Sequence, residues 1–139
     1  MRLPWHYPPI LAYHRVHPNG AKDTPTLHPR TFEQQMSLLA QRWHPIPFDR
    51  LIQALEHAEA LPRRSVVITF DDGTGDFYQY ALPILLRHRI PAALFMIAGN
   101  IGKPGWLAQE ELRRLPGQGV TVGSHTFRHD YLPSLPLAQ

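Results

Sequence analysis

The amino-acid sequence predicts an α/β fold in which parallel strands are joined by helices. Short β-branched or apolar runs are typical of buried strands, for example "SVVITF" at residues 65–70 and "GVTVGSH" at residues 119–125. Amphipathic helical patterns lie between these runs, and the 15 prolines and nine glycines fall mostly at the boundaries. Strands that alternate with helices in this way pair in parallel through right-handed crossovers.

The first half of the chain contributes one strand and two helices. Residues 10–16, "ILAYHRV", predict a short buried strand that a polar loop follows. Amphipathic patterns predict helices at residues 31–43 and 49–61, with Thr31 and Asp49 as their N-cap residues. A weak strand is predicted near His44, directly after the first helix.

The second half of the chain continues the alternation. Strands are predicted at residues 65–70, 92–98 and 119–125, and helices at residues 76–90 and 106–115. Pro83 should interrupt the first of these helices, because proline has no N–H to donate. Active sites in such sheets lie at the carboxyl ends of the strands, so the functional residues are expected there.

Composition excludes several classes of protein. The chain has 139 residues, of which 43% are hydrophobic and 18% are charged, as expected for one ordered globular domain. The formal charge is +3, but the basic residues are scattered and predict no nucleic-acid partner. Cysteine is absent, which excludes disulfides and thiolate metal sites. We expect no membrane span, and the start of the chain, interrupted by Pro4, Pro8 and Pro9, has no signal-peptide pattern. The compartment stays open.

Two adjacent carboxylates, Asp71 and Asp72, directly follow the apolar run at residues 65–70. Aspartate is rare in strands and costly to bury without a partner. Both side chains can enter one site only if the strand ends or bulges there, and Gly73 and Gly75 permit that turn. A bound cation would neutralise one carboxylate and make the second tolerable nearby. Taken alone, the pair fits a helix cap or a turn equally well.

A second polar cluster, "SHTFRHD", follows the last predicted strand and contains His125 and His129. On a helical turn, two imidazoles four residues apart would project from one face. That spacing suits a divalent metal, and a carboxylate such as that of Asp72 is the usual third partner in catalytic zinc sites. Taken alone, the two histidines are more simply explained as surface or core residues.

"TFDDG" at residues 69–73, followed by "SHTFRH" at residues 124–129, resembles the first two motifs of the NodB-homology polysaccharide deacetylases, carbohydrate esterase family four. The resemblance extends over roughly residues 10–135 and implies a partial or truncated (β/α) barrel. It implies a chain that corresponds, over residues 1–139, to the N-terminal portion of the family domain and is incomplete at the C-terminus. An unclosed barrel leaves a strand edge uncovered, which favours self-association.

The same resemblance implies the roles of the polar residues. Asp71 would be the general base, and the metal ligands would be Asp72, His125 and His129. The divalent metal would be zinc in the first place, with cobalt or nickel as alternatives. Thr126 would support the loop without binding the metal.

The general acid is expected on the N-terminal side of the chain. "ILAYHRVHP" resembles the family branch that deacetylates poly-N-acetylglucosamine exopolysaccharides, in which a Tyr-His pair on the first strand brings the acid. His14 is therefore the candidate acid, and the alternative is a core histidine at a strand end. Five other histidines are expected on the surface or in loops, namely His17, His28, His44, His57 and His88.

The implied function is metal-dependent removal of N-acetyl groups from a β-linked N-acetylglucosamine polymer, a hydrolysis of amide bonds. The sequence does not separate poly-N-acetylglucosamine from peptidoglycan or chitin. Two alternatives stay open. One is an O-acetyl esterase acting on a xylan-like polysaccharide, and the other is a non-catalytic remnant that binds a metal or a carbohydrate.

Overall fold

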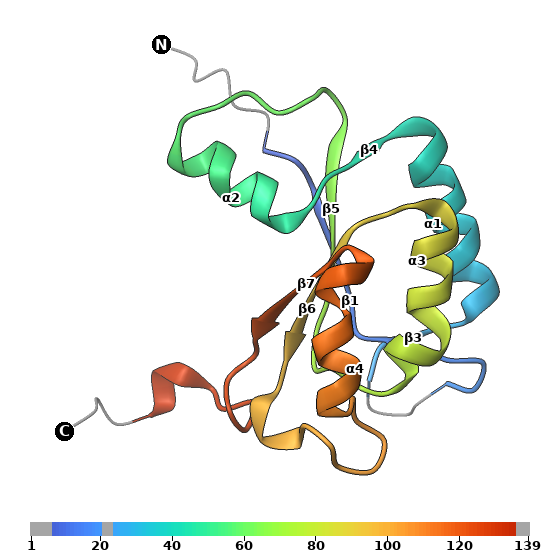
Figure 1. Cartoon of the computed structure of the whole chain (residues 1–139), viewed down its shortest axis with the longest axis vertical. Coiled ribbons are helices and arrows are strands. Elements are labelled where there is room, and N and C mark those ends of the chain that lie inside the picture. Colours follow the sequence, from blue (N-terminus) through green and yellow to red (C-terminus); the bar gives the residue numbers. More distant parts are fainter. Residues whose placement is uncertain (1–6, 21–23, 136–139) are drawn as a thin grey trace.

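A parallel sheet forms the centre of the molecule, as the sequence predicts (Figure 1). The computed structural model describes residues 7–20 and 24–135. The strands follow the order β1-β5-β6-β7, with β4 beside the start of β5, and every pairing is parallel. They are β1 (Ile10–Tyr13), β4 (His44–Pro45), β5 (Ser65–Phe70), β6 (Ala92–Met96) and β7 (Val120–Ser124). The carboxyl ends of β5 and β7 therefore lie at the same edge of one sheet.

The predicted first strand is interrupted at His14. β1 ends at Tyr13, and the chain then leaves the main sheet to form β2 (Arg15–Val16), which pairs in parallel with β3 (Thr26–Leu27). The prediction of one continuous strand was wrong here. The backbone after His14 pairs with β3, and hydrogen-bond donors of the same segment bind the buried carboxylate of Asp76, which follows β5 in the sequence. Pro4, one of the prolines that argue against a signal peptide, lies outside the described residues.

In the described part of the chain, four α-helices surround the sheet: α1 (Pro29–Arg42), α2 (Phe48–Glu56), α3 (Leu82–His88) and α4 (Gln109–Arg114). The predicted cap Thr31 was wrong, because α1 begins earlier. His28 is the N-cap residue, and its Nδ1 accepts a hydrogen bond from the N–H of Arg30 at 3.2 Å. Asp49 is likewise not the cap of α2, since Pro47 takes that position and Asp49 lies in the first turn.

Pro83 widens the helix instead of breaking it. A π-helical turn, η1 (Phe77–Ala81), precedes α3, and the N–H of Leu82 donates to the carbonyl oxygen of Phe77, five residues back. Pro83 has no N–H with which to make the next bond of a regular ladder. Pro83 lies in the first turn of α3, directly after the π-helical turn, so the widened ladder accommodates the missing bond and the helix continues to His88.

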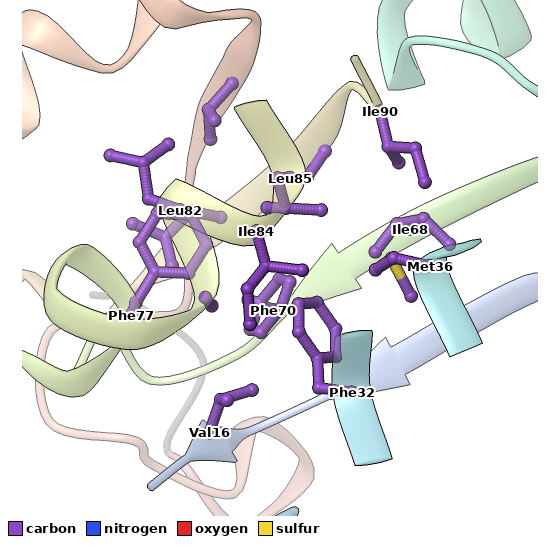
Figure 2. Close-up of a cluster of buried hydrophobic side chains, with 14 of the residues drawn as sticks. Val16, Phe32, Met36, Ile68, Phe70, Phe77, Leu82, Ile84, Leu85 and Ile90 are labelled. Carbon is purple, nitrogen blue, oxygen red and sulfur yellow. The ribbon is translucent and has the colours of Figure 1, made fainter. Parts of the chain in front are cut away.

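The main core lies between one face of the sheet and helices α1 and α3, which stand to the right of the sheet in Figure 1. Figure 2 shows Phe32 from α1, Phe70 from β5 and Phe77 from η1 grouped around one point. The ring of Phe70 lies 5.7 Å from that of Phe32 and 4.8 Å from that of Phe77, both edge to face. Such pairs add about 0.5–1.5 kcal/mol each beyond area burial. This packing fixes the end of β5, from which the site projects.

Helix α2 covers the opposite face of the sheet. Val67 of β5 packs there against Ile46 and Leu51, and the rings of Phe48 and Phe95 meet edge to face at 5.5 Å. Among the described residues, β1 and β7 are the two edge strands of the sheet. They do not pair with each other, so the barrel is not closed. The architecture is that of a partial (β/α) barrel. No helix in residues 7–20 and 24–135 combines the length and the apolar character that crossing a membrane requires.

Candidate metal centre

Asp71 and His14 each directly follow one of two paired strands, β5 and β1. The N–H of Asp71 donates to the carbonyl oxygen of Tyr13 at 2.9 Å, which extends the β1–β5 pairing beyond the strands. His14 is the next residue after Tyr13 and is half-buried. Burial raises the pKa of the Tyr13 hydroxyl, which donates to Oε1 of Gln35 at 2.9 Å. Tyr13 thus stays protonated near neutral pH.

A sharp turn separates the two neighbouring carboxylates. Asp72 has φ of 73° and Gly73 has φ of 83°, and the N–H of Gly73 donates to the carbonyl oxygen of Asp71 at 2.9 Å. A Cβ at position 73 would lie 2.0 Å from the sulfur of Met96, so a larger residue there would have to displace that side chain as well as adopt a positive φ. The turn ends the alternation of the strand and directs Asp72 toward the histidines that follow β7.

His125 and His129 converge on Asp72 without a helix. The expected helical turn is wrong, because residues 125–130 form an irregular bend after β7. Positive φ values of 64° at Thr126 and 63° at His129 fold the backbone back instead. The imidazole centroids lie 4.8 Å apart, and the hydroxyl of Thr126 accepts a hydrogen bond from the N–H of Asp130 at 3.2 Å. Thr126 thus braces the bend.

The three side chains fit a single divalent cation. Oδ1 of Asp72 lies 3.7 Å from Nε2 of His125 and 3.8 Å from Nε2 of His129, and one ligand atom of each residue lies within 4.8 Å of the others. Two ligands of one tetrahedral zinc ion lie about 3.4 Å apart. Two imidazoles and one carboxylate are also a donor set that leaves a position open. The side chain of His129 is 61% exposed, so the cluster is open to solvent on that side.

A family model described as polysaccharide deacetylase matches residues 58–139, which is more than half of the chain. The chain belongs to the polysaccharide deacetylase family. The match contains Asp71, Asp72 and both histidines of the cluster, whereas His14 precedes it. Membership agrees with the resemblance that the two motifs carry in the sequence.

Individual relatives of this polysaccharide deacetylase chain are longer than it is. It is 30% identical over 122 residues to the protein YxkH of Bacillus subtilis, covering 87% of this chain and 43% of YxkH. It is 32% identical over 106 residues to the poly-β-1,6-N-acetyl-D-glucosamine N-deacetylase of Staphylococcus aureus, covering 71% of this chain and 36% of that protein. The structure of the Streptococcus pyogenes deacetylase PplD in complex with acetate matches with a TM-score of 0.85 and 26% identity, covering 93% of this chain and 60% of PplD. The chain spans less than half the length of the two curated relatives.

Asp76 is a buried residue of this polysaccharide deacetylase chain whose role the sequence analysis did not predict. It directly precedes η1. Its side chain is 4% exposed, and its two oxygens accept hydrogen bonds from Nε of Arg15 and from the N–H of Val16, each at 3.0 Å. In the sequence, Asp76 is an aspartate at the start of a helical pattern. That position indicates a helix N-cap more often than a buried residue that joins two segments. Asp76 connects the segment after His14 to the segment after Asp71 and Asp72.

Proposed function

We propose that this chain carries the metal-binding and proton-transfer residues of a polysaccharide N-deacetylase acting on a β-linked N-acetylglucosamine polymer. The observation that carries the proposal is the convergence of Asp72, His125 and His129 beside the second carboxylate, Asp71. A lone cluster of acids and imidazoles is common on protein surfaces. Here it lies at the carboxyl ends of parallel strands, where active sites of such folds are built.

The residues that would hold the metal are Asp72, His125 and His129. When bound, a divalent metal would supply Lewis acidity to the acetyl carbonyl and to the attacking water. Oxygen and imidazole donors serve zinc, cobalt and nickel alike, and zinc is the proposed resident ion.

Proton transfer is assigned to Asp71 and His14. Asp71 accepts a proton from water as the water oxygen bonds to the acetyl carbon. The carbon–nitrogen bond then breaks, and His14 donates a proton to the departing nitrogen. One amide and one water give one amine and one acetic acid, which ionises to acetate, and the proton that Asp71 took returns through solvent to restore His14. Asp71 and His14 extend from neighbouring strand ends, so they can act on the same acetamido group.

Two observations support an N-acetylglucosamine polymer as the substrate. The Staphylococcus aureus relative is named for N-deacetylation of poly-β-1,6-N-acetyl-D-glucosamine. The exposed position of His129 leaves the site open on one side, as a polymer chain requires. We propose poly-N-acetylglucosamine as the polymer.

The direct test is acetate release by the purified chain loaded with zinc. We expect release from β-1,6-linked N-acetylglucosamine oligomers and little from acetylated xylan. Asp72→Asn and His125→Ala should abolish release and stoichiometric zinc in elemental analysis. Asp130→Asn, which alters an exposed carboxylate at the same bend, is the matched control and should retain both.

Three results would contradict the proposal in different ways. Preference for acetylated xylan would indicate an O-acetyl esterase. Zinc binding with no release from either polymer would indicate a non-catalytic binding protein. Full zinc content in both Asp72→Asn and His125→Ala would remove the metal site itself.

A further inference from the structure

One short segment at the end of β6 hydrogen-bonds both to the turn that contains Asp72 and to the bend that contains His125 and His129. The carbonyl oxygen of Met96 accepts from the N–H of His125 at 2.8 Å, and the N–H of Ile97 donates to the carbonyl oxygen of Asp72 at 3.1 Å. The next two N–H groups continue the series. Ala98 donates to the carbonyl oxygen of Thr126 at 3.0 Å, and Gly99 donates to that of Phe127 at 2.9 Å. Four consecutive residues, 96–99, thus bind the backbone of the Asp72 turn on one side and of the histidine bend on the other.

The acceptors of this segment include two strained residues. Asp72 has φ of 73° and Thr126 has φ of 64°, a region that is uncommon for residues other than glycine and is least favourable for a β-branched side chain such as that of Thr126. Strained conformations of this kind persist only where the surroundings fix them. The N–H groups of Ile97 and Ala98 bind the carbonyl oxygens of these two residues. The segment therefore stabilises the conformations that aim Asp72 and the two histidines at one point.

Gly99 makes the close approach of the histidine bend possible. A Cβ built at this position would lie 2.5 Å from the carbonyl oxygen of Phe127 and 3.2 Å from its ring. The first of these atoms belongs to the backbone, so it cannot move aside as the end of a flexible side chain can. Any larger residue at position 99 must push the bend that contains His125 and His129 away from β6, and so change its distance from Asp72.

We propose that residues 96–99 act as a spacer that sets the separation between Asp72 and the His125–His129 pair, with Gly99 as its positioning residue. Each of the four hydrogen bonds that join the spacer to the centre links two backbone groups. The inference rests on the proposed metal site. Its consequence is that metal affinity depends on a residue that provides no ligand atom.

The test compares zinc affinity among variants by calorimetric titration of the metal-free chain. Gly99→Ala should weaken zinc binding about 10- to 100-fold, the range expected when the supports of a metal ligand are altered. Gly117→Ala is the matched control, because a Cβ at Gly117 has nothing within 4 Å, and it should bind as the parent does. Ile84→Val, a buried change in α3, controls for general destabilisation and should also keep the affinity.

A second variant, Ala98→Pro, tests the spacer if Gly99→Ala does not fold. Ala98 is the first residue of a short 3-10 helix, where proline is tolerated, and Ile97 before it is extended. Ala98→Pro removes the N–H that binds Thr126 and should also weaken zinc binding about tenfold or more. Far-UV and near-UV circular dichroism of the metal-free variants establishes that each is folded.

The outcomes separate the spacer from the metal site. If the parent chain does not bind zinc, the proposed site and the spacer both fail. If the parent binds zinc and folded Gly99→Ala or Ala98→Pro binds it equally well, only the spacer fails. Weaker binding in Gly117→Ala or Ile84→Val to the same extent would also overturn the spacer, because it would show a general loss of stability.

Discussion

Asp72, Thr126 and His129 have φ values of 73°, 64° and 63°, a region that residues with a Cβ seldom adopt. Each such conformation is unfavourable by about 1–3 kcal/mol. Glycine adopts this region most readily, aspartate and histidine adopt it more often than most residues, and the β-branched Thr126 is the exceptional one of the three. The backbone at these three positions therefore adopts a locally unfavourable conformation that brings the side chains of the cluster together.

His14 gives the first prediction at the scale of single residues. His14→Ala should lower amide turnover by about 10² to 10⁴, the usual contribution of general-acid catalysis, because the leaving nitrogen then lacks its proton donor. Hydrolysis of an activated acetyl ester should be spared, since its leaving group departs without a proton. Acetate release from N-acetylglucosamine oligomers and from the ester is measured in parallel, with zinc content by elemental analysis.

His17 provides the matched control for this prediction. It is also half-buried and follows β2, but its ring packs edge to face on Tyr80 at 5.2 Å, and its Nδ1 accepts a hydrogen bond from the N–H of Asn19 at 3.0 Å. His17→Ala should change the two activities little. Equal losses on amide and ester in His14→Ala would reduce His14 to a packing residue.

At the scale of secondary-structure elements, Asp76, which directly precedes η1, hydrogen-bonds to both residues of β2 and so holds these two segments together. Asp76→Ala should lower the free energy of unfolding by about 1–3 kcal/mol for each buried group left without a partner. The buried N–H of Val16 is one such group, and the guanidinium of Arg15, 29% exposed, is partly rescued by water. Urea denaturation of the metal-free chain measures the loss without a contribution from metal binding.

An exposed ion pair gives the comparison for Asp76. Glu59 binds Arg50 at 2.6 Å, but their side chains are 49% and 34% exposed. Glu59→Ala should therefore change the free energy of unfolding by less than about 1 kcal/mol. A similar loss in Asp76→Ala and Glu59→Ala would mean that the carboxylate of Asp76 does not fasten the two segments.

The elements that the sequence predicted well are those with a strong hydrophobic period. β5 is buried along its whole length, and its β-branched run predicted it with the correct bounds at residues 65–70. The break at His14 and the π-helical turn before α3 depend on partners distant in sequence or on a missing N–H, which periodicity does not encode. The roles of Asp72, His125 and His129 as metal ligands came from motif likeness and stay a prediction, whereas the bend that brings the three side chains together depends on contacts with β6 that no local pattern records.

At the scale of the whole molecule, the sheet ends in two strands that have a partner on one side only within the described part of the chain. Val122 of β7 is 39% exposed and Ile10 of β1 is 50% exposed, so apolar side chains accompany both edges. Edge strands with apolar side chains are templates for pairing with another chain. A second copy could pair antiparallel along β7 and form a closed twofold dimer.

We predict that the chain dimerises through the β7 edge in a concentration-dependent manner. Val122→Lys should shift sedimentation equilibrium toward the monomer, because a lysine on an edge strand opposes pairing with a second strand. Leu86→Lys is the matched control, since Leu86 is 45% exposed but lies on α3, away from the edge. It should leave the dimerisation constant unchanged. A parent chain that is monomeric at every concentration measured, or equal shifts in both variants, would show that the open edge of this sheet does not drive association.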